Sequence, residues 1–333
     1  MVTQGDDVET KEKVLRILYE EGKSISGEAI ASRLGISRNS VWKAVNSLKA
    51  SGYIITATSE GYCIEDGNVF DEYSIKQHLT REHKLHLYKK ESSSNLIAKQ
   101  LCQNGEEHGS VVIVESQTEG RGRMGRSFLS SSENGLYLSV ILRPKISIDK
   151  CLSVTVAAAV AVATAIEETS GVECGIKWVN DIYINNKKCA GILTEATMDF
   201  ESSSVQYIVV GIGVNISPPT EGFHKDIEEI ACGVYEKGYP QGYKAKLCAK
   251  IIDNLFDLYD ELEGKKYFEI YKSKSIIIGK EVDVYVGDSV MCGTAIDIDE
   301  NANLIVVDNE GTRHTVNSGD ARVRQANDKR GIL

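Results

Sequence analysis

The stretch Val111-Val-Ile-Val-Glu-Ser-Gln-Thr-Glu-Gly-Arg-Gly-Arg-Met-Gly-Arg126 joins a continuous apolar run to a loop of glycine and arginine. The β-branched run predicts a buried strand, and Gly120 to Gly125 matches the G-x-G-x-x-G spacing of dinucleotide-binding loops. That fingerprint requires a helix after the loop, whereas here a turn leads into a second strand from Gly135 to Arg143. The stretch therefore argues against a nicotinamide site and predicts a different ligand site in a mixed α/β domain.

Three arginines, Arg121, Arg123 and Arg126, lie within six residues of this loop. Guanidinium groups bind phosphate and carboxylate oxygens through several N–H donors at once. The alternative is an exposed basic loop without a ligand, which leaves the clustering of three like charges unexplained. The loop therefore predicts a site where two mutually repelling anions are brought together.

A second group of polar residues lies in the stretch from Ile176 to Leu193. Lys177, Asn180 and Asp181 supply a cation, an amide and a carboxylate suited to a metal ion at a strand junction. Taken alone, the Asn-Asp pair could serve only as a turn, and Lys188 could be a solvated charge. Together with the arginine loop, these residues predict one anion-binding site.

The same stretch predicts a β-hairpin, with Asn185-Asn186 at its turn. The strand that follows, from Tyr207 to Ile216, contains Gly211 and Gly213. Glycine inside a strand commonly marks a place where a ligand or another backbone approaches closely. We therefore expect these two glycines to lie at the site.

The N-terminal segment has the pattern of a helix-turn-helix. Residues 10–21 show helical periodicity, and a shorter helix is expected from Ser26 to Leu34. Gly35 supplies the turn, and Ser37 is a suitable N-cap for a third helix that reaches Leu48.

Gly52 to Ile64 then alternates like two short strands around a Ser-Glu-Gly turn, which indicates a winged helix-turn-helix. Between Ala29 and Ser59 there are four basic residues and no acidic one, which favours DNA binding over a bundle with a merely solvated polar face. Because the net charge is -10, any such binding must be local. Trp42 is expected to pack in the core. The residues expected to face a DNA groove are Arg38, Asn39, Ser40, Lys43 and Asn46.

Composition sets the remaining limits. A chain of 333 residues with 42% apolar residues suits two or three domains. The alanine-rich run from Val154 to Ile166 is shorter than the ~20 residues that span a bilayer, so we expect a buried helix. The first residues lack the pattern of a signal peptide, which predicts a cytoplasmic protein without membrane attachment. Eight cysteines without a Cys-x-x-Cys pair predict reduced thiols and no structural metal site.

These motifs together closely resemble the biotin protein ligases of the bifunctional type that also act as biotin operon repressors. The resemblance covers nearly the whole chain. Its marks are the arginine loop, which is similar to the biotin and adenylate loop of that family, and Lys177-Trp-Val-Asn-Asp181, which is similar to its Lys-Trp-Pro-Asn-Asp motif. Two departures are Val179 for the stiffer proline and Ser94 for threonine, and we expect activity to survive both.

The resemblance implies that a Ser-Ser-Asn motif contacts the ureido ring of biotin, that Phe128 covers bound biotin, and that Lys188 holds the reacting carboxylate. The residues expected to bind biotin are Ser93, Ser94, Asn95, Gln117, Gly120, Arg121, Arg123, Phe128, Lys188, Gly191, Gly211 and Gly213. Those expected to bind ATP or the adenylate are Arg121, Arg123, Arg126, Lys177, Asn180, Asp181 and Asn215.

The C-terminal segment between Gly279 and Val316 alternates as short strands with turns at Gly287-Asp288, Asp299 to Asn301 and Glu310-Gly311, which predicts a small β-barrel. The resemblance implies an SH3-like domain there. The expected fold class is α+β. It comprises a winged helix-turn-helix in residues 1–66, a central mixed α/β ligase domain of the class II synthetase-like type in 67–275, and the SH3-like barrel in 276–333.

The implied function has two steps: biotin and ATP, with Mg²⁺ near Asp181, form biotinyl-5′-AMP, and a lysine of biotin carboxyl carrier protein then accepts the biotin. Arg123, Lys177 and Lys188 are the expected catalytic residues. The resemblance also implies a ligand-bound homodimer that places two helix-turn-helix units on operator DNA.

Two alternatives remain at this point. The first is a lipoate ligase, which the DNA-binding module and the Gly-Arg-Gly-Arg loop oppose. The second is a repressor that senses biotin without catalysis, which the intact Lys177 and Lys188 oppose.

Overall fold

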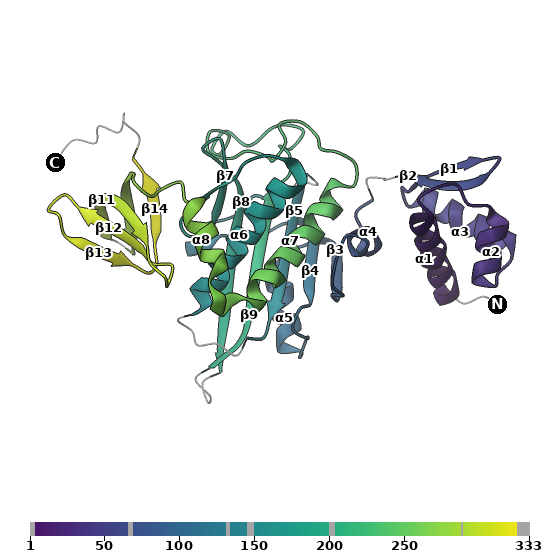
Figure 1. Ribbon diagram of the computed structural model, residues 1–333, viewed down its shortest axis with the longest axis horizontal. Coiled ribbons are helices and arrows are strands. Elements are labelled where there is room, and N and C mark those ends of the chain that lie inside the picture. The colour runs from purple at the N-terminus through teal and green to yellow at the C-terminus, as the bar shows by residue number, and fades with distance from the viewer. Residues whose placement is uncertain are drawn as a thin grey trace. The chain divides into compact units, whose positions relative to one another are not determined.

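The computed structural model describes residues 4–65, 69–130, 134–144, 150–199, 204–287 and 289–324. The domain boundary expected at 66/67 lies outside these residues, as do the centre of the turn at 130–135 and position 288 of the Gly-Asp turn. The described chain divides into two compact units (Figure 1). One consists of Met1–His78 with Pro240–Lys246, and the other of Leu79–Tyr239 with Leu247–Leu333.

The first unit contains the predicted helix-turn-helix. Its elements are α1 (Gln4–Glu21), α2 (Gly27–Leu34), α3 (Arg38–Ala50), β1 (Ile54–Thr58), β2 (Gly61–Glu65) and α4 (Glu72–Lys76). The Ser26 hydroxyl caps α2 by accepting a hydrogen bond from the Ala29 amide, and the Ser37 hydroxyl caps α3 by accepting one from the Ser40 amide, each at 3.1 Å. Gly35 ends α2 in the left-handed conformation. The antiparallel β1–β2 pair forms the expected wing.

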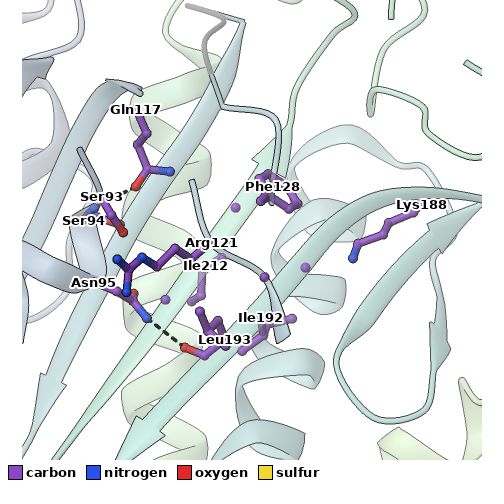
Figure 2. Close-up of a pocket in the computed structure, with 14 residues that line it drawn as sticks. Ser93, Ser94, Asn95, Gln117, Arg121, Phe128, Lys188, Ile192, Leu193 and Ile212 are labelled. Carbon is purple, nitrogen blue, oxygen red and sulfur yellow. Dashed lines mark hydrogen bonds between the residues drawn. The ribbon is translucent and has the colours of Figure 1, made fainter. Parts of the chain in front are cut away.

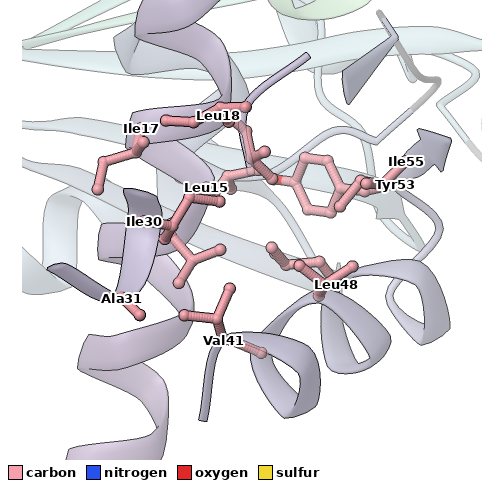
Figure 3. Packing of buried hydrophobic residues seen from close by; sticks show 13 residues of the cluster. Leu15, Ile17, Leu18, Ile30, Ala31, Val41, Leu48, Tyr53 and Ile55 are labelled. Carbon is pink, nitrogen blue, oxygen red and sulfur yellow. The ribbon is translucent and has the colours of Figure 1, made fainter. Parts of the chain in front are cut away.

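An apolar core holds these helices together, with Leu15, Leu18, Ile30, Val41 and Leu48 among its members (Figure 3). Trp42 is not part of this core: 55% of its surface is exposed. The expectation that it packs inside was wrong. The buried positions of α3 follow a spacing of three and four residues, which turns the residue after Val41 outward.

The second unit is built on a seven-stranded mixed sheet in the order β3-β4-β5-β9-β8-β7-β6. The strands are β3 (Leu85–Glu91), β4 (Val111–Gln117), β5 (Gly135–Leu142), β6 (Gly175–Lys177), β7 (Asp181–Ile184), β8 (Lys187–Asp199) and β9 (Ser204–Asn215). Asn185 and Asn186 both have positive φ at the turn between β7 and β8, as a tight hairpin requires. The predicted strands and hairpin are therefore present.

Helices cover both faces of this sheet. They are α5 (Ser94–Gln103), α6 (Cys151–Ser170), α7 (Tyr243–Asp260) and α8 (Lys266–Ser273), with single 3₁₀ turns η1 (Arg123–Gly125) and η3 (Leu262–Gly264). Figure 1 shows α6 and α8 on one face and α5 on the other. Ala98 and Cys102 of α5 pack on Val112, Val114 and Val209. Although α6 is long and apolar enough to cross a membrane, its apolar residues are buried in this unit, as predicted.

The C-terminal part is a five-stranded antiparallel sheet in the order β13-β12-β11-β10-β14. Its strands are β10 (Glu281–Val286), β11 (Ser289–Ile298), β12 (Leu304–Asp308), β13 (Arg313–Val316) and β14 (Asp320–Val323). The sequence pattern predicted the first four strands and missed β14, which pairs with β10. The missed strand carries Asp320, which reaches the site.

Candidate functional site

The floor of the candidate site is a hollow in the sheet face that α5 covers. The strand register sets Gly191 of β8 directly opposite Gly213 of β9, and Gly211 opposite Ser139 of β5. A Cβ on Gly213 would lie 2.6 Å from the Phe128 ring, and one on Gly211 would overlap the Asn95 amide. The two glycines of β9 are therefore needed because side chains, rather than another backbone, pack directly on the strand.

A pocket opens above this floor (Figure 2). In the view, Lys188 and Phe128 lie on one side of it, and Gln117, Ser94 and Asn95 on the other. All the predicted biotin-binding residues except Gly120 and Arg123 line it, together with Gly122, Ile192, Leu193 and Ile212. Residues from distant parts of the chain are thus brought together as expected.

One end of the pocket is a buried hydrogen-bond network of mostly neutral side chains, and in the view of Figure 2 the Arg121 side chain extends from the loop toward Asn95 at this end. The Ser94 amide donates to Gln117 Oε1 at 2.7 Å. Ser139 Oγ lies 2.8 Å from Ser94 Oγ and 2.6 Å from Asn95 Oδ1. The Asn95 Nδ2 group donates to Glu195 Oε2 at 2.8 Å. Each of these polar groups is held in one orientation before a ligand arrives.

Two members of this network, Ser139 and Glu195, were not predicted. Ser139 is fully buried, and Glu195 also forms an ion pair with Lys99 at 2.5 Å. The signal that could have found Ser139 is a hydroxyl in an otherwise apolar strand. Buried hydroxyls need a partner, so such a residue indicates a polar neighbour in the core.

The other end of the pocket is the arginine loop, which is an ordered turn. The Gly122 amide donates to the Arg126 carbonyl at 2.7 Å, and the Phe128 amide donates to the Gly120 carbonyl at 2.8 Å. Gly120 therefore closes the loop through its backbone and does not line the pocket. Met124 at the loop tip is left-handed, and 57% of its surface is exposed.

Arg123 does not line the pocket but reaches the Lys-Trp-Val-Asn-Asp motif. Its Nη1 donates to Asn180 Oδ1 at 3.2 Å. Burial lowers the pKa of the Arg123 guanidinium below its ordinary value, while Asp181 and Asp320 oppose that shift. A half-buried guanidinium thus lies beside the pocket, and among the described residues its one hydrogen bond to a side chain is the one that Nη1 donates to Asn180.

Lys188 lies with Phe128 on the side of the pocket opposite Asn95 (Figure 2). Its Nζ is 2.7 Å from Asp181 Oδ1, an ion-pair distance without the geometry of a hydrogen bond. The same nitrogen is 5.8 Å from the centre of the Phe128 ring. The lysine therefore borders both the apolar floor and the predicted metal-binding carboxylate.

The motif around Val179 is fixed by its neighbours. Trp178 Nε1 donates to the Ala302 carbonyl at 2.9 Å, and Tyr271 Oη donates to the Val179 carbonyl at 3.1 Å. Asn180 Nδ2 donates to the Ile192 carbonyl at 2.7 Å, and the Ile192 amide donates back to the Asn180 carbonyl. These bonds define the position of Asn180 with valine in place of the proline of the family; the Trp178–Val179 peptide is cis.

Two predicted nucleotide-binding cations contact a residue that the sequence did not single out. Asp320 Oδ2 accepts from Arg126 Nη2 at 2.9 Å, and Asp320 Oδ1 lies 3.6 Å from Lys177 Nζ. Burial alone would raise the pKa of Asp320, but Lys177 and Arg126 outweigh it and hold the pKa below its ordinary value. Asp320 is therefore an anion in direct contact with the predicted phosphate-binding groups.

Asn215 lies apart from the main pocket. It ends β9 and lines a separate, smaller hollow with Asn134, Tyr137 and Phe223. Among the described residues, no group of three or more His, Cys, Asp or Glu side chains is arranged to hold a metal ion.

The predicted DNA-binding residues lie on α3 of the other unit. Arg38, Asn39, Lys43 and Asn46 are exposed, as a groove-facing surface requires. Ser40 is half-buried, and its hydroxyl is 2.9 Å from that of Ser37 in the helix cap, so it is less available than expected. The exposed Trp42 adds an aromatic surface to this helix, contrary to its expected burial.

Three protein-family models match separate parts of the chain. Residues 87–215 match the Biotin/lipoate A/B protein ligase family, residues 10–63 match the HTH domain, and residues 277–324 match the Biotin protein ligase C terminal domain.

Individual relatives match over most of their length. The chain is 32% identical over 298 residues to the bifunctional ligase/repressor BirA of Bacillus subtilis, covering 87% of this chain and 91% of that protein. It is 25% identical over 302 residues to BirA of Escherichia coli K12, covering 87% and 90%. Among solved structures, the biotin protein ligase from Aquifex aeolicus in complex with biotin and ATP matches with a TM-score of 0.60 and 25% identity. That match covers 73% of this chain and 99% of the other.

Proposed function

Because the chain belongs to the family of bifunctional biotin ligase/repressors, we propose that its pocket joins biotin to ATP as biotinyl-5′-AMP and passes the biotinyl group to a lysine of biotin carboxyl carrier protein. The chain is a biotin protein ligase with a DNA-binding repressor domain. The observation that carries the detailed proposal is one pocket whose lining combines hydrogen-bonded neutral side chains, the cations of Arg121 and Lys188, and a floor of glycines.

We assign the neutral end to the ureido ring of biotin. A ureido group has two N–H donors and one carbonyl acceptor. The Ser94, Asn95 and Gln117 side chains offer both donors and acceptors in fixed positions. The apolar part of biotin would lie against the Phe128 ring, which itself packs on Gly213, so that apolar area is buried without polar cost.

We assign the other end to the reacting groups. A carboxylate oxygen of biotin attacks the α-phosphorus of ATP, the bond from that phosphorus to the bridging oxygen breaks, and pyrophosphate leaves. Arg121, Arg123 and Lys188 would hold the two anions together and neutralise the charge that develops at phosphorus. In the second step a carrier lysine attacks the acyl carbon, and AMP leaves without a covalent enzyme intermediate.

We assign Arg126, Lys177, Asn180 and Asn215 to the nucleotide. Mg²⁺ fits this arrangement through Asp181: among the described residues Asp181 Oδ1 is a buried carboxylate oxygen that accepts no hydrogen bond, and the Lys188 ammonium 2.7 Å from it would give way to the ion. Magnesium commonly uses one or two carboxylates and takes its other ligands from phosphates and water. When bound, it would supply further neutralisation of the triphosphate.

The division of labour follows the expected domains. We propose that residues 1–66 bind operator DNA, that residues 67–275 carry the ligase site, and that residues 276–333 support it. Ligand-bound chains would pair as homodimers in the cytoplasm, so that two copies of α3 meet the two halves of a palindromic operator.

The ligase proposal is tested by incubating the purified chain with biotin, ATP, Mg²⁺ and a biotin carboxyl carrier domain. A parallel reaction contains lipoate and its carrier. We expect biotinylated carrier only. Lipoate transfer would overturn the substrate assignment, and tight biotin binding without transfer would favour a purely sensory repressor.

The repressor proposal is tested by a gel shift on the chain's own biotin operon, with and without biotin and ATP. We expect binding that ligand strengthens, because ligand favours the dimer. Absent or ligand-independent binding would contradict this form of regulation.

A further inference from the structure

Asp320 belongs to the C-terminal sheet but contacts cations of the central domain. Its carboxylate accepts from Arg126 at 2.9 Å and lies 3.6 Å from Lys177 and 3.4 Å from Arg322. The Asp320 and Lys177 side chains are only 16% and 15% exposed. The carboxylate is therefore largely withdrawn from water and surrounded by positive charge.

Other contacts across this boundary do not involve Asp320. Lys272 of α8 pairs with Asp297 of β11 at 2.6 Å, and Trp178 donates to the Ala302 carbonyl. These contacts hold the two parts of the unit together independently of Asp320. The Asp320 contacts are therefore not needed merely to dock the C-terminal sheet.

A triphosphate and the Asp320 carboxylate are both anions and would use the same donors. Arg126 and Lys177 cannot give their full charge to a phosphate while a carboxylate lies between them. A bound triphosphate would also be repelled by Asp320 at close range, and this repulsion is strong where water is largely excluded.

We propose that Asp320 is an internal competitor for the nucleotide: it neutralises Arg126 and Lys177 in the empty site and releases them when the triphosphate of ATP binds. This inference rests on the proposed use of ATP at this site. It makes Asp320 a residue that sets nucleotide affinity, and it links nucleotide binding to the C-terminal sheet through β14.

The test is the binding of ATP, and separately of inorganic triphosphate, to the full chain by isothermal titration calorimetry. Asp320→Asn removes the competing charge and keeps a similar shape. We expect it to bind both ligands ~5-fold more tightly than the unmodified chain, because one competing ion pair is lost. Its affinity for biotin should stay unchanged, which also shows that the variant is folded.

Asp297→Asn is the matched control, since it breaks an ion pair between the same two parts away from the site. It should bind ATP like the unmodified chain. Equal or weaker ATP binding by Asp320→Asn would overturn the proposal and make Asp320 a residue that positions the two cations instead. An equal gain in Asp297→Asn would also overturn it.

A second measurement uses the unmodified chain and does not depend on how a variant folds. Inorganic triphosphate should accelerate amide hydrogen exchange in β14, because the Asp320 contacts are released. Unchanged or slower exchange there would contradict the release. Failure of the ligase proposal can be told apart from failure of this inference. If the chain does not biotinylate carrier but Asp320→Asn still binds triphosphate more tightly, the ligase proposal is wrong and the competition by Asp320 stands.

Discussion

The two ends of the pocket solve different physical problems. At the neutral end, Ser94, Asn95 and Gln117 are already hydrogen-bonded in the orientation that a ligand would meet. At the cationic end, Lys188 and Arg126 are paired with carboxylates that a bound anion would have to replace. The neutral end can therefore recognise a ligand without rearrangement, whereas the charged end has to exchange partners during the reaction.

This difference predicts that changes at the charged end affect the chemical step and that changes at the neutral end affect biotin affinity. The largest effect is expected for Lys188→Ala and for Arg123→Ala. Each removes a cation from the region where charge develops, and adenylate formation should slow ~10³-fold. Single-turnover release of pyrophosphate measures this step directly.

Lys187→Ala is the matched control for the lysine. Lys187 is adjacent in sequence, but its Nζ donates to the Glu228 carbonyl, and it does not line the pocket. Its rate should be near that of the unmodified chain. A near-normal rate in Lys188→Ala or Arg123→Ala would contradict the idea that the charged end serves the chemical step.

The next largest effect, on biotin binding, is expected at the glycine floor of the pocket. In Gly213→Ala the new Cβ would lie 2.6 Å from the Phe128 ring and push it away from the strand. We expect the KM for biotin to rise roughly 30-fold, because overpacking of this size costs a few kcal/mol. Steady-state kinetics with the carrier assay measures it.

Gly264→Ala serves as the control, since a Cβ there meets nothing within 4 Å. It should leave the KM for biotin unchanged. Unaltered biotin affinity in Gly213→Ala would show that biotin lies elsewhere.

A smaller effect is expected at the neutral end. Glu195→Gln removes the charge that fixes the Asn95 amide and pairs with Lys99. The introduced glutamine amide can donate as well as accept a hydrogen bond, so it no longer fixes the Asn95 amide in one orientation. We therefore expect the KM for biotin to rise ~10-fold. The KM for ATP and the single-turnover rate at saturating biotin should stay unchanged.

The control is Glu167→Gln, which alters an equally half-buried pair with Lys274 elsewhere in the same unit. It should change none of these constants. If Glu195→Gln lowered the chemical rate rather than the biotin affinity, the neutral end would take part in the chemistry as well.

The sequence predicted what depends on local pattern. The arginine loop, the β7–β8 hairpin and the capped helices each follow from residues within a short window. Most of the predicted biotin-binding residues line the pocket, and they could be predicted because they belong to motifs of the family.

Pairings between distant segments were not predictable in this way. Ser139 and Glu195 join the network through strand register, and Asp320 reaches Lys177 from a strand that the pattern missed. Trp42 is a different kind of error. The spacing of Val41, Ala44 and Val45 places position 42 on the outer face of α3, whereas the usual burial of tryptophan predicts the opposite.

Trp42→Ala provides the smallest expected effect and changes neither end of the pocket. The exposed indole lies on the face of α3 that also presents Asn39 and Asn46, and an aromatic surface there can contact thymine methyl groups. We expect operator affinity to fall ~5-fold in a gel shift, by the same factor with and without biotin and ATP, while carrier biotinylation stays unchanged. Replacing operator thymines with deoxyuridine should weaken binding of the unmodified chain and have little effect on the variant. If instead DNA binding by the variant no longer responded to biotin and ATP, Trp42 would take part in coupling the pocket to DNA. The comparison of the two pocket ends would then have to include the helix-turn-helix.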